Sequence, residues 1–458
     1  MKKENKFPKK PYFTRGGVHA PHNKNTCDKD TLVMPCPKMV ILPMSQHIGA
    51  PCKPVVKVGD TVSVGQIVGD STEFVSAPIH SSISGVVKKI EKITMPNGMK
   101  VDSVFIESDG EMRMDPSIEV PVINDRTDFL KAVRSSGLVG LGGAGFPAHV
   151  KLNIPTNRTV DTLIINVAEC EPYITSDHRE VIENSWDIMS GIFAVKEILN
   201  IHRVIIGVEK NKPDAIKILT NIADNEFDKD DEIKVLPLKA TYPQGAEKIL
   251  IKACTNREVP IGKLPSDASC IVMNVASVSF LSRFLKTGVP LITKRITIDG
   301  SAIKNPCNVI VPIGTPIKDV IDFVGGYKET PKKLLMGGPM MGISLPDDEL
   351  PVLKQNNAII ALNEKDARLN EESACIRCGR CAMSCPMGLL PIEISNAVDR
   401  KDFESMNKYY IQNCMECGCC SFSCPAKRHL VQNIKLGKAL INQKRKSDIS
   451  KGGAKNGK

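Results

Sequence analysis

Two runs of cysteine near the C-terminus have the spacing of iron–sulfur ligands. Each run is Cys-x-x-Cys-x-x-Cys-x-x-x-Cys-Pro, a spacing that binds [4Fe–4S] clusters in two-cluster electron carriers. Three cysteines of one run bind three irons of a cluster, and the fourth iron takes the last cysteine of the other run. The sequence therefore predicts one cluster on Cys375, Cys378, Cys381 and Cys424, and a second on Cys385, Cys414, Cys417 and Cys420.

Structural zinc is the alternative for these cysteines, because zinc sites also use Cys-x-x-Cys pairs. A zinc ion needs only four ligands, however, and rarely takes three evenly spaced cysteines with a fourth before a proline. We therefore favour iron–sulfur clusters. Cys419 is an additional cysteine inside the second run, and we expect it to bind no iron because the spacing is complete without it.

A glycine-rich segment at 137–152, GLVGLGGAGFPAHVKL, is the second candidate site. Gly140, Gly142 and Gly145 fit the pattern G-x-G-x-x-G, and glycines let backbone N–H groups approach a phosphate closely. The context differs from the dinucleotide-binding fingerprint, because a helical pattern precedes the loop and the apolar strand follows it. A glycine turn that only packs between two elements explains the spacing equally well.

Two carboxylates follow the next strand pattern, TLIIN at 162–166. They are Glu169 and Glu171, in the sequence Glu-Cys-Glu-Pro. Carboxylates at the end of a strand, close to a phosphate site, are suited to binding ribose or ring hydroxyls. A solvated acidic loop is the alternative interpretation.

The composition is typical of a redox protein in a reducing cytosol. Eight of the 16 cysteines are the expected ligands in the two runs and Cys419 lies beside them, while the other seven stand singly, unlike the framework of a secreted protein. We expect no signal peptide and no membrane helix, since no apolar stretch reaches roughly 20 residues. The net charge of +10 lies partly in the two termini, which are either solvated or attract an acidic carrier protein or an anionic membrane. Few aromatics and no recognisable motif argue against nucleic acid as a partner.

Hydrophobic and turn patterns divide the chain into blocks. Residues 1–125 contain short β-branched runs between glycine turns, and their order over 52–90 resembles the hammerhead of biotinyl and lipoyl carriers, without the carriers' modifiable lysine. Residues 126–290 alternate helical and strand patterns, which predicts a Rossmann-like α/β domain with a mainly parallel sheet. Residues 291–345 are expected to form a β-grasp module.

The C-terminal part of the chain is expected to bind the clusters. Residues 346–364 are interpreted as a linker, and residues 365–435 as a helical, ferredoxin-like domain around the two cysteine runs. The basic segment 436–458 is expected to be disordered. The predicted fold class is therefore a multidomain protein with α/β and α+β parts.

The loop GLGGAGFP with its following lysine, and then Asn-x-Ala-Glu-Cys-Glu-Pro, resembles the NADH-oxidising flavoprotein subunit of respiratory complex I. The chain is still more similar to the RnfC family of the ion-translocating ferredoxin:NAD oxidoreductases, because that resemblance includes the hammerhead and both cysteine runs. It implies non-covalent FMN, NAD(H) as substrate, and a soluble-ligand-binding β-grasp (SLBB) module at 291–345. The residues that match FMN or NADH contacts are Gly140, Gly142, Gly143, Gly145, Phe146, Lys151, Asn166, Glu169, Glu171, Tyr242, Gly245, Glu247 and Asn274.

One departure from the complex I flavoprotein concerns the flavin. Ala168 stands where that protein has an aspartate, which removes a possible contact to FMN. The cysteine runs have no such departure.

The resemblance implies a peripheral location at the cytoplasmic face of the cell membrane. Electrons would pass from reduced ferredoxin, through integral-membrane and ferredoxin-like subunits, to the two clusters, then to FMN and NAD, or in reverse. FMN is needed because NAD accepts a hydride, whereas a cluster passes one electron. Two alternatives are a soluble flavin and iron–sulfur reductase, such as a cobalamin reductase, and a non-catalytic electron-transfer scaffold. The related scaffold protein of the sodium-pumping quinone reductase lacks both cysteine runs.

Overall fold

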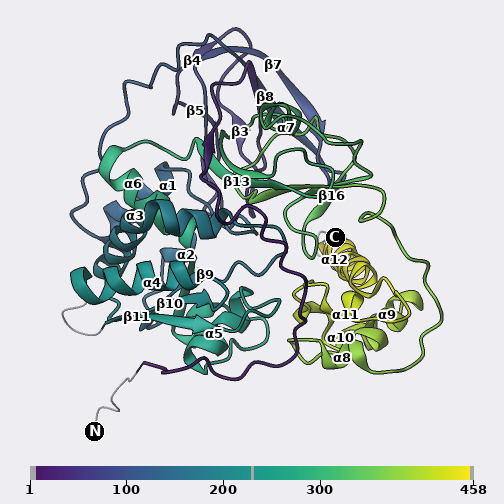
Figure 1. The fold of residues 1–458 in the computed structure, drawn as a ribbon. Helices are drawn as coiled ribbons and strands as arrows, with labels where there is room; N and C mark the ends of the chain where they lie inside the picture. The colour runs from purple at the N-terminus through teal and green to yellow at the C-terminus, as the bar shows by residue number, and fades with distance from the viewer. Residues whose placement is uncertain (1–6, 228–231, 454–458) are drawn as a thin grey trace.

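The computed structural model describes residues 7–227 and 232–453, with side chains up to residue 448 (Figure 1). It confirms a multidomain protein of mixed α and β structure. Within these residues, no helix is long and apolar enough to cross a bilayer.

The N-terminal domain consists of two small sheets, which confirms the all-β unit predicted for this block. The larger sheet has the order β2-β8-β7-β4 and the smaller β3-β5-β6. Val62, Ile79 and Val87, which come from both sheets, belong to the same buried core. The strands are β2 (Met39–Pro43), β3 (Lys53–Pro54), β4 (Thr61–Val62), β5 (Ile67–Asp70), β6 (Ile79–His80), β7 (Gly85–Thr94) and β8 (Lys100–Ser108).

The central domain places helices around a four-stranded parallel sheet. Its order is β11-β10-β9-β12, so successive strands add to one side of β9 until the chain crosses to the other side at β12. Doubly wound nucleotide-binding folds have the same order, and their ligands bind where it reverses. The strands are β9 (Thr162–Val167), β10 (Arg203–Glu209), β11 (Ile233–Leu238) and β12 (Cys270–Asn274). The helices are α1 (Arg126–Ser135), α2 (Ala148–Leu152), α3 (Ser176–Leu199), α4 (Pro213–Ile222), α5 (Glu247–Thr255) and α6 (Val275–Thr287), with a π-helical turn at Ala223–Phe227 and a 3-10 turn at Pro265–Ala268.

The third sheet corrects the predicted linker. Its order is β1-β14-β13-β17-β15-β16, and β17 (Ala358–Leu362) pairs with both β13 and β15. The interpretation of 346–364 as a linker is therefore wrong. All five residues of β17 are buried, as expected of a short apolar run that is covered on both faces. The other elements are β1 (Leu32–Val33), β13 (Thr293–Asp299), β14 (Cys307–Pro312), β15 (Lys333–Met336), β16 (Ile343–Leu345) and α7 (Ile317–Phe323).

The C-terminal domain is helical, as predicted, but its basic tail is not disordered up to residue 453. Helix α12 (Leu430–Gly453) continues through most of the tail, and residues 454–458 lie outside the described residues. Leu430, Ile434 and Ile441 of α12 are buried, and the last two pack against α9 in the core of this domain. The other helices are α8 (Arg380–Met383), α9 (Pro391–Asp399), α10 (Phe403–Lys408), a 3-10 turn at Ile411–Asn413, and α11 (Cys419–Phe422).

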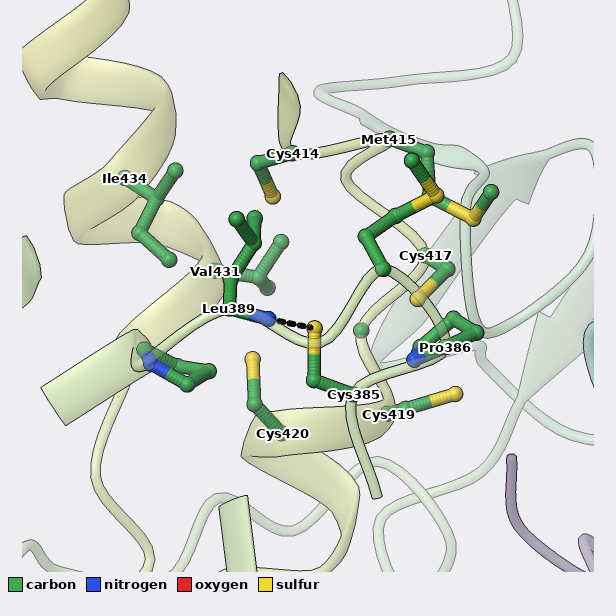
Figure 2. A pocket seen from close by; sticks show the side chains of 13 residues that line it. Cys385, Pro386, Leu389, Cys414, Met415, Cys417, Cys419, Cys420, Val431 and Ile434 are labelled. Carbon is green, nitrogen blue, oxygen red and sulfur yellow. Dashed lines mark hydrogen bonds between the residues drawn. The ribbon is translucent and has the colours of Figure 1, made fainter. Parts of the chain in front are cut away.

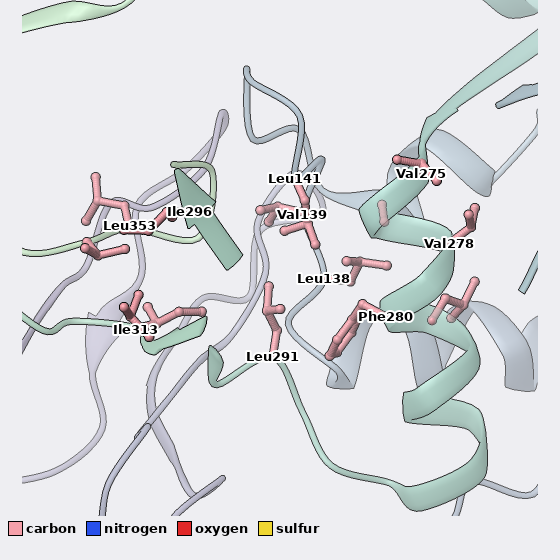
Figure 3. Packing of buried hydrophobic residues seen from close by; sticks show 14 of the residues in the cluster. Leu138, Val139, Leu141, Val275, Val278, Phe280, Leu291, Ile296, Ile313 and Leu353 are labelled. Atoms are coloured by element: carbon pink, nitrogen blue, oxygen red, sulfur yellow. The ribbon is translucent and has the colours of Figure 1, made fainter. Parts of the chain in front are cut away.

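One buried core joins the glycine loop to its neighbours (Figure 3). Leu138, Val139 and Leu141, at the start of the loop, belong to the same cluster as Val278 of α6 and Ile296 of β13. The loop is therefore anchored by its apolar side chains between the central domain and the third sheet.

Candidate functional site

Two asparagines lie side by side where the strand order of the central sheet reverses. Asn166 is the last residue but one of β9, Asn274 ends β12, and the two are direct register partners. The Asn166 amide donates to the carbonyl of Gly245 at 2.8 Å, and the Asn274 amide donates to the carboxylate of Asp177 at 2.7 Å. The structure thus brings three of the predicted site residues to the edge of the sheet where such folds bind ligands.

The glycine loop lies against this edge. A Cβ added at Gly142 would be 2.4 Å from the amide nitrogen of Asn274, so only glycine fits there. The N–H of Leu141 donates to Ser277 at 3.1 Å, and its carbonyl accepts from Lys294 at 2.9 Å. The loop tip, residues 142–144, is exposed.

Other predicted residues close and flank the loop. The N–H of Gly140 donates to the carbonyl of the half-buried Phe146 at 2.9 Å. Gly145 has a φ of +66°, in the left-handed region that glycine tolerates best. Lys151 donates to Glu247 at 2.8 Å and to the carbonyl of residue 272 in β12 at 3.0 Å. Lys151, predicted to contact the flavin, is thus already paired with another predicted residue.

Glu169 caps a helix rather than facing solvent. Its carboxylate accepts from the N–H of Asp177 at 2.7 Å, at the start of α3, where a negative charge is favoured. Lys24, from the extended N-terminal segment, donates to the carbonyls of both Glu169 and Glu171 at 2.8 Å. Lys24 is half-buried, and the burial of its amine lowers the pKa of that group. The sequence analysis missed it, since a single lysine so far from this turn gives no signal.

Glu171 connects the turn to the third sheet. Its two oxygens accept from the N–H groups of Met340 and Met341 at 3.0 and 2.8 Å. A Cβ at Gly338 would be 2.2 Å from this carboxylate, so the loop approaches it closely. The contact of Glu171 with NADH stays a prediction, and the structure shows that the carboxylate has a second role in joining two domains.

Buried charges lie beneath the glycine loop. Burial raises the pKa of the Asp177 carboxyl to about 7, and the negative charge of Glu169 acts in the same direction. Burial lowers the pKa of Lys294 to about 8, against the attraction of Asp177. Neither residue was predicted from the sequence. Lys294 bonds the loop directly through the Leu141 carbonyl, and Asp177 bonds Asn274 beside it, so both buried charges help to position this site.

Tyr242 joins the central domain to the second cysteine run. It is buried, and its hydroxyl donates to the carbonyl of Cys417 at 2.8 Å. In the same turn, a Cβ on Gly245 would be 2.1 Å from the carbonyl of Ala168, which stands where the complex I flavoprotein has an aspartate. One short turn therefore contacts both candidate sites.

The second set of cysteines surrounds one cavity (Figure 2). Cys385, Cys414, Cys417 and Cys420 all line it, so the last cysteine of the first run lies beside the second run, and their binding of one cluster stays a prediction. Cys419 also lines the cavity, with its sulfur close to that of Cys417, and this sulfur donates to the carbonyl of residue 242 at 3.8 Å. The N–H of residue 389 donates to the Cys385 sulfur at 3.4 Å.

The spacing of these sulfurs fits a cluster better than zinc. Within the described residues, no three Cys, His, Asp or Glu side chains are close enough together to bind one metal ion. Four zinc ligands would each lie about 2.3 Å from a single ion. A cubane cluster binds each thiolate through a different iron, so its ligands surround a larger space than a single ion needs, and the four cysteines here line one cavity.

The first set is more open. Cys381 and Cys424 are half-buried and near enough that a charge on Cys424 raises the pKa of the Cys381 thiol, although burial contributes more. Cys375 and Cys378 are exposed. The crossing of the last cysteine, Cys424, to the first run is thus consistent with the geometry.

The edge of the central sheet fits a bound FMN. The exposed tip of the glycine loop offers backbone N–H groups, and a Cβ at Gly143 would meet no atom within 4 Å. Gln244 has a buried amide nitrogen with no hydrogen-bond partner among the described residues. Open glycine backbone suits a phosphate, and a free buried donor suits the polar edge of a ring.

Comparison with protein families matches four segments of the chain. The models are the RnfC barrel sandwich hybrid domain at 13–111, the Nuo51 FMN-binding domain at 133–283, the SLBB domain at 295–344, and the 4Fe-4S dicluster domain at 374–427. They confirm the predicted types of domain and the predicted cofactors, FMN and two [4Fe–4S] clusters.

Whole-chain relatives decide the family. The RnfC protein of the Na⁺-translocating ferredoxin:NAD⁺ oxidoreductase complex of Acetobacterium woodii is 43% identical over 95% of this chain and 98% of its own. The chain belongs to the RnfC family. A second RnfC relative, from the proton-translocating complex of Clostridium ljungdahlii, is 44% identical over 92% of both chains. A third, from Rhodobacter capsulatus, is 37% identical over 95% of this chain and 85% of its own. The resemblance inferred from the sequence is confirmed, and the relatives favour RnfC over a cobalamin reductase.

Among solved structures, an NAD⁺-reducing [NiFe]-hydrogenase in the H₂-reduced state has 16% identity and a TM-score of 0.49, covering 68% of this chain and 61% of that chain.

Proposed function

We propose that this chain passes electrons between NAD(H) and the membrane-bound subunits of an ion-translocating ferredoxin:NAD oxidoreductase. It sits at the cytoplasmic face of the membrane, and ferredoxin supplies its electrons indirectly, through integral-membrane and ferredoxin-like subunits. The names of the A. woodii and C. ljungdahlii relatives support the reaction. The match to FMN-binding and dicluster models supports the cofactors.

The residues at the edge of the central sheet have distinct tasks in this function. When bound, FMN exchanges one hydride for two single electrons. Backbone N–H groups of Gly142 and Gly143 would hold its phosphate, and Asn166 and Asn274 would orient its ring from the ends of their strands. Lys294 and Asp177 hold the loop and Asn274 in place, and so keep these groups rigid.

A single observation supports the coupling of the two sites most strongly. The hydroxyl of Tyr242 donates to the carbonyl of Cys417, while the same turn packs Gly245 on Ala168. The cavity of the second cysteine set is therefore fixed directly against the flavin-binding domain. We propose that the cluster on Cys385, Cys414, Cys417 and Cys420 exchanges electrons with FMN.

The reaction can be tested in membranes. Membranes from cells that lack this chain should not reduce NAD⁺ with ferredoxin, and the wild-type chain should restore the activity. The Gly142→Val chain should assemble but not restore it. Undiminished ferredoxin-dependent NAD⁺ reduction without the chain would contradict the proposal.

A further inference from the structure

The two cysteine runs are structural repeats, so their positions can be compared one by one. Arg377 and Glu416 stand at the same place in the two runs and have φ values of 53° and 59°. Their N–H groups donate to the sulfurs of Cys375 and Cys414, both at 3.4 Å. The short helices α8 and α11 then begin five residues after each of these cysteines.

In the second run, the residues between the ligands are used within the chain. Met415 and Cys419 pack in one apolar cluster with Tyr242 of the central domain. Glu416 pairs with Lys438 of α12 at 2.7 Å. This face of the run is therefore an interface, and it is directed toward the domain that binds FMN.

In the first run, the same positions have no partner among the described residues. Ile376 replaces Met415 and is 67% exposed. Arg377 and Arg380, which replace Glu416 and Cys419, are exposed and form no ion pair with any residue that the structure describes. Three positions that form an interface in the second repeat are thus exposed in the first, beside the exposed thiols of Cys375 and Cys378. Met383, in α8, is 70% exposed as well, and its counterpart Phe422 is 48% exposed.

The charge of this face is mainly positive. Residues 373–392 and 417–429 contain the cations Arg377, Arg380, Lys427 and Arg428 and no carboxylate, although Glu371 and Glu372 directly precede the first of these segments. Of these four cations, only Arg428 is paired within the part of the chain that the structure describes, with Glu372 at 3.2 Å. A small apolar patch beside positive side chains suits brief electron-transfer encounters, whose association rate rises when the partner carries the opposite charge.

We propose that the face formed by Ile376, Arg377, Arg380 and Met383 docks an acidic iron–sulfur protein, which exchanges electrons with the first cysteine set. The inference rests on the proposed function, because it needs the clusters and FMN. Each encounter moves one electron and makes or breaks no bond. When NAD⁺ is reduced, the partner is oxidised and the first set is reduced. When NADH is oxidised, the electron moves the other way.

Binding can be measured with a two-cluster ferredoxin of net negative charge as the probe. The chain is loaded anaerobically with iron, sulfide and FMN, and its Kd for the probe is determined at low salt. The double variant Arg377→Glu/Arg380→Glu should raise Kd about tenfold or more, as reversed charges at a steered interface do. The matched control is Lys53→Glu/Lys57→Glu, which changes the net charge equally on exposed residues of the N-terminal domain.

Three results would overturn the proposal. They are an unchanged Kd for the Arg377/Arg380 variant, an equal rise in the control, and wild-type binding that does not weaken between about 50 and 300 mM salt. Should charge reversal lower the iron content, Arg377→Gln/Arg380→Gln is compared in the same way.

Two further measurements separate the alternatives. Vesicles rich in phosphatidylglycerol test a membrane as the occupant, and vesicle binding that requires both arginines while ferredoxin binding does not would overturn the proposal. Reduction of ferricyanide by NADH tests the proposed function alone. If the wild-type chain fails there but still binds the probe through Arg377 and Arg380, the function fails and the docking surface stands.

Discussion

At the scale of single residues, Gly142 determines whether the glycine loop can lie against Asn274. A side chain there would collide with the asparagine amide, whose nitrogen is 2.4 Å from the position that an added Cβ would take. Overpacking of this kind costs roughly 1–3 kcal/mol. Gly142→Val should therefore weaken FMN binding about tenfold or more, measured by flavin fluorescence titration, and should leave the iron content unchanged.

Ala144→Ser, on the exposed tip of the same loop, is the matched control and should bind FMN as the wild type does. Equal affinity of Gly142→Val and the wild type would show that the loop does not bind the flavin.

The spacing of the second run predicts that Cys419 binds no iron, because the run is complete without it. In the structure its sulfur lies close to that of Cys417 and donates to the backbone carbonyl of Tyr242. Cys419→Ser should keep about eight irons and eight sulfides per chain, whereas Cys420→Ser, one residue away, should lose about four of each. Loss of iron from the Cys419 variant, or stoichiometric zinc in the wild type, would refute the ligand assignment.

The residues predicted from sequence share a property that the missed ones lack. Cysteine spacing and the glycine pattern are local, so the geometry that they impose is visible in a short segment. Lys24 bonds the backbone of Glu169, Asp177 accepts from Asn274, and Lys294 bonds the backbone of the glycine loop. All three act from positions that are distant in the sequence or carry no pattern. Their roles depend on tertiary contacts, which the sequence alone does not reveal.

At the scale of elements, the turn with Tyr242 is the joint between the two candidate sites. Tyr242→Phe removes the hydrogen bond to the Cys417 carbonyl but keeps the ring that packs there. Both cofactors should remain bound, while electron transfer from FMN to the clusters slows several-fold, followed by stopped-flow absorbance after mixing with NADH.

Tyr410→Phe is the control, because that tyrosine is 58% exposed in the cluster domain. A Tyr242→Phe variant as fast as this control would mean that the hydrogen bond does not contribute to coupling.

Elements with a strong local pattern were predicted well, and those defined by their neighbours were not. The strand pattern at 162–166 lies in β9, and the helical domain predicted around the cysteine runs contains α9 and α10. β17 was taken for a linker, because five apolar residues do not indicate which strands lie on either side. The tail was taken for disorder, because its charge is visible in the sequence but its apolar contacts with α9 are not.

At the scale of the whole molecule, Lys354 joins three parts of the fold. Its amine donates to the carbonyls of Pro78 and Gly137 at 2.6 and 2.8 Å, which belong to the N-terminal and central domains. Complete burial lowers its pKa from 10.5 to about 7. Between these values the unfolded chain binds more protons than the folded chain, so stability should rise as the pH rises from about 7.

Lys354→Met should abolish this rise, seen as a smaller gain in Tm between about pH 7 and 9 than in the wild type. Lys57→Met, at an exposed lysine, is the control and should keep the wild-type dependence. The same gain in all three proteins would show that Lys354 does not titrate in this range.

The central claim is that FMN connects NAD to the two clusters inside this one chain. The most direct measurement starts with the anaerobically loaded chain, whose clusters are reduced by limiting dithionite before NAD⁺ is added. With FMN bound, the reduced clusters should be reoxidised as NADH fluorescence appears, one NADH for every two electrons. Without FMN, the clusters should stay reduced. Cluster reoxidation that forms NADH equally well without FMN, or none when FMN is bound, would contradict the account.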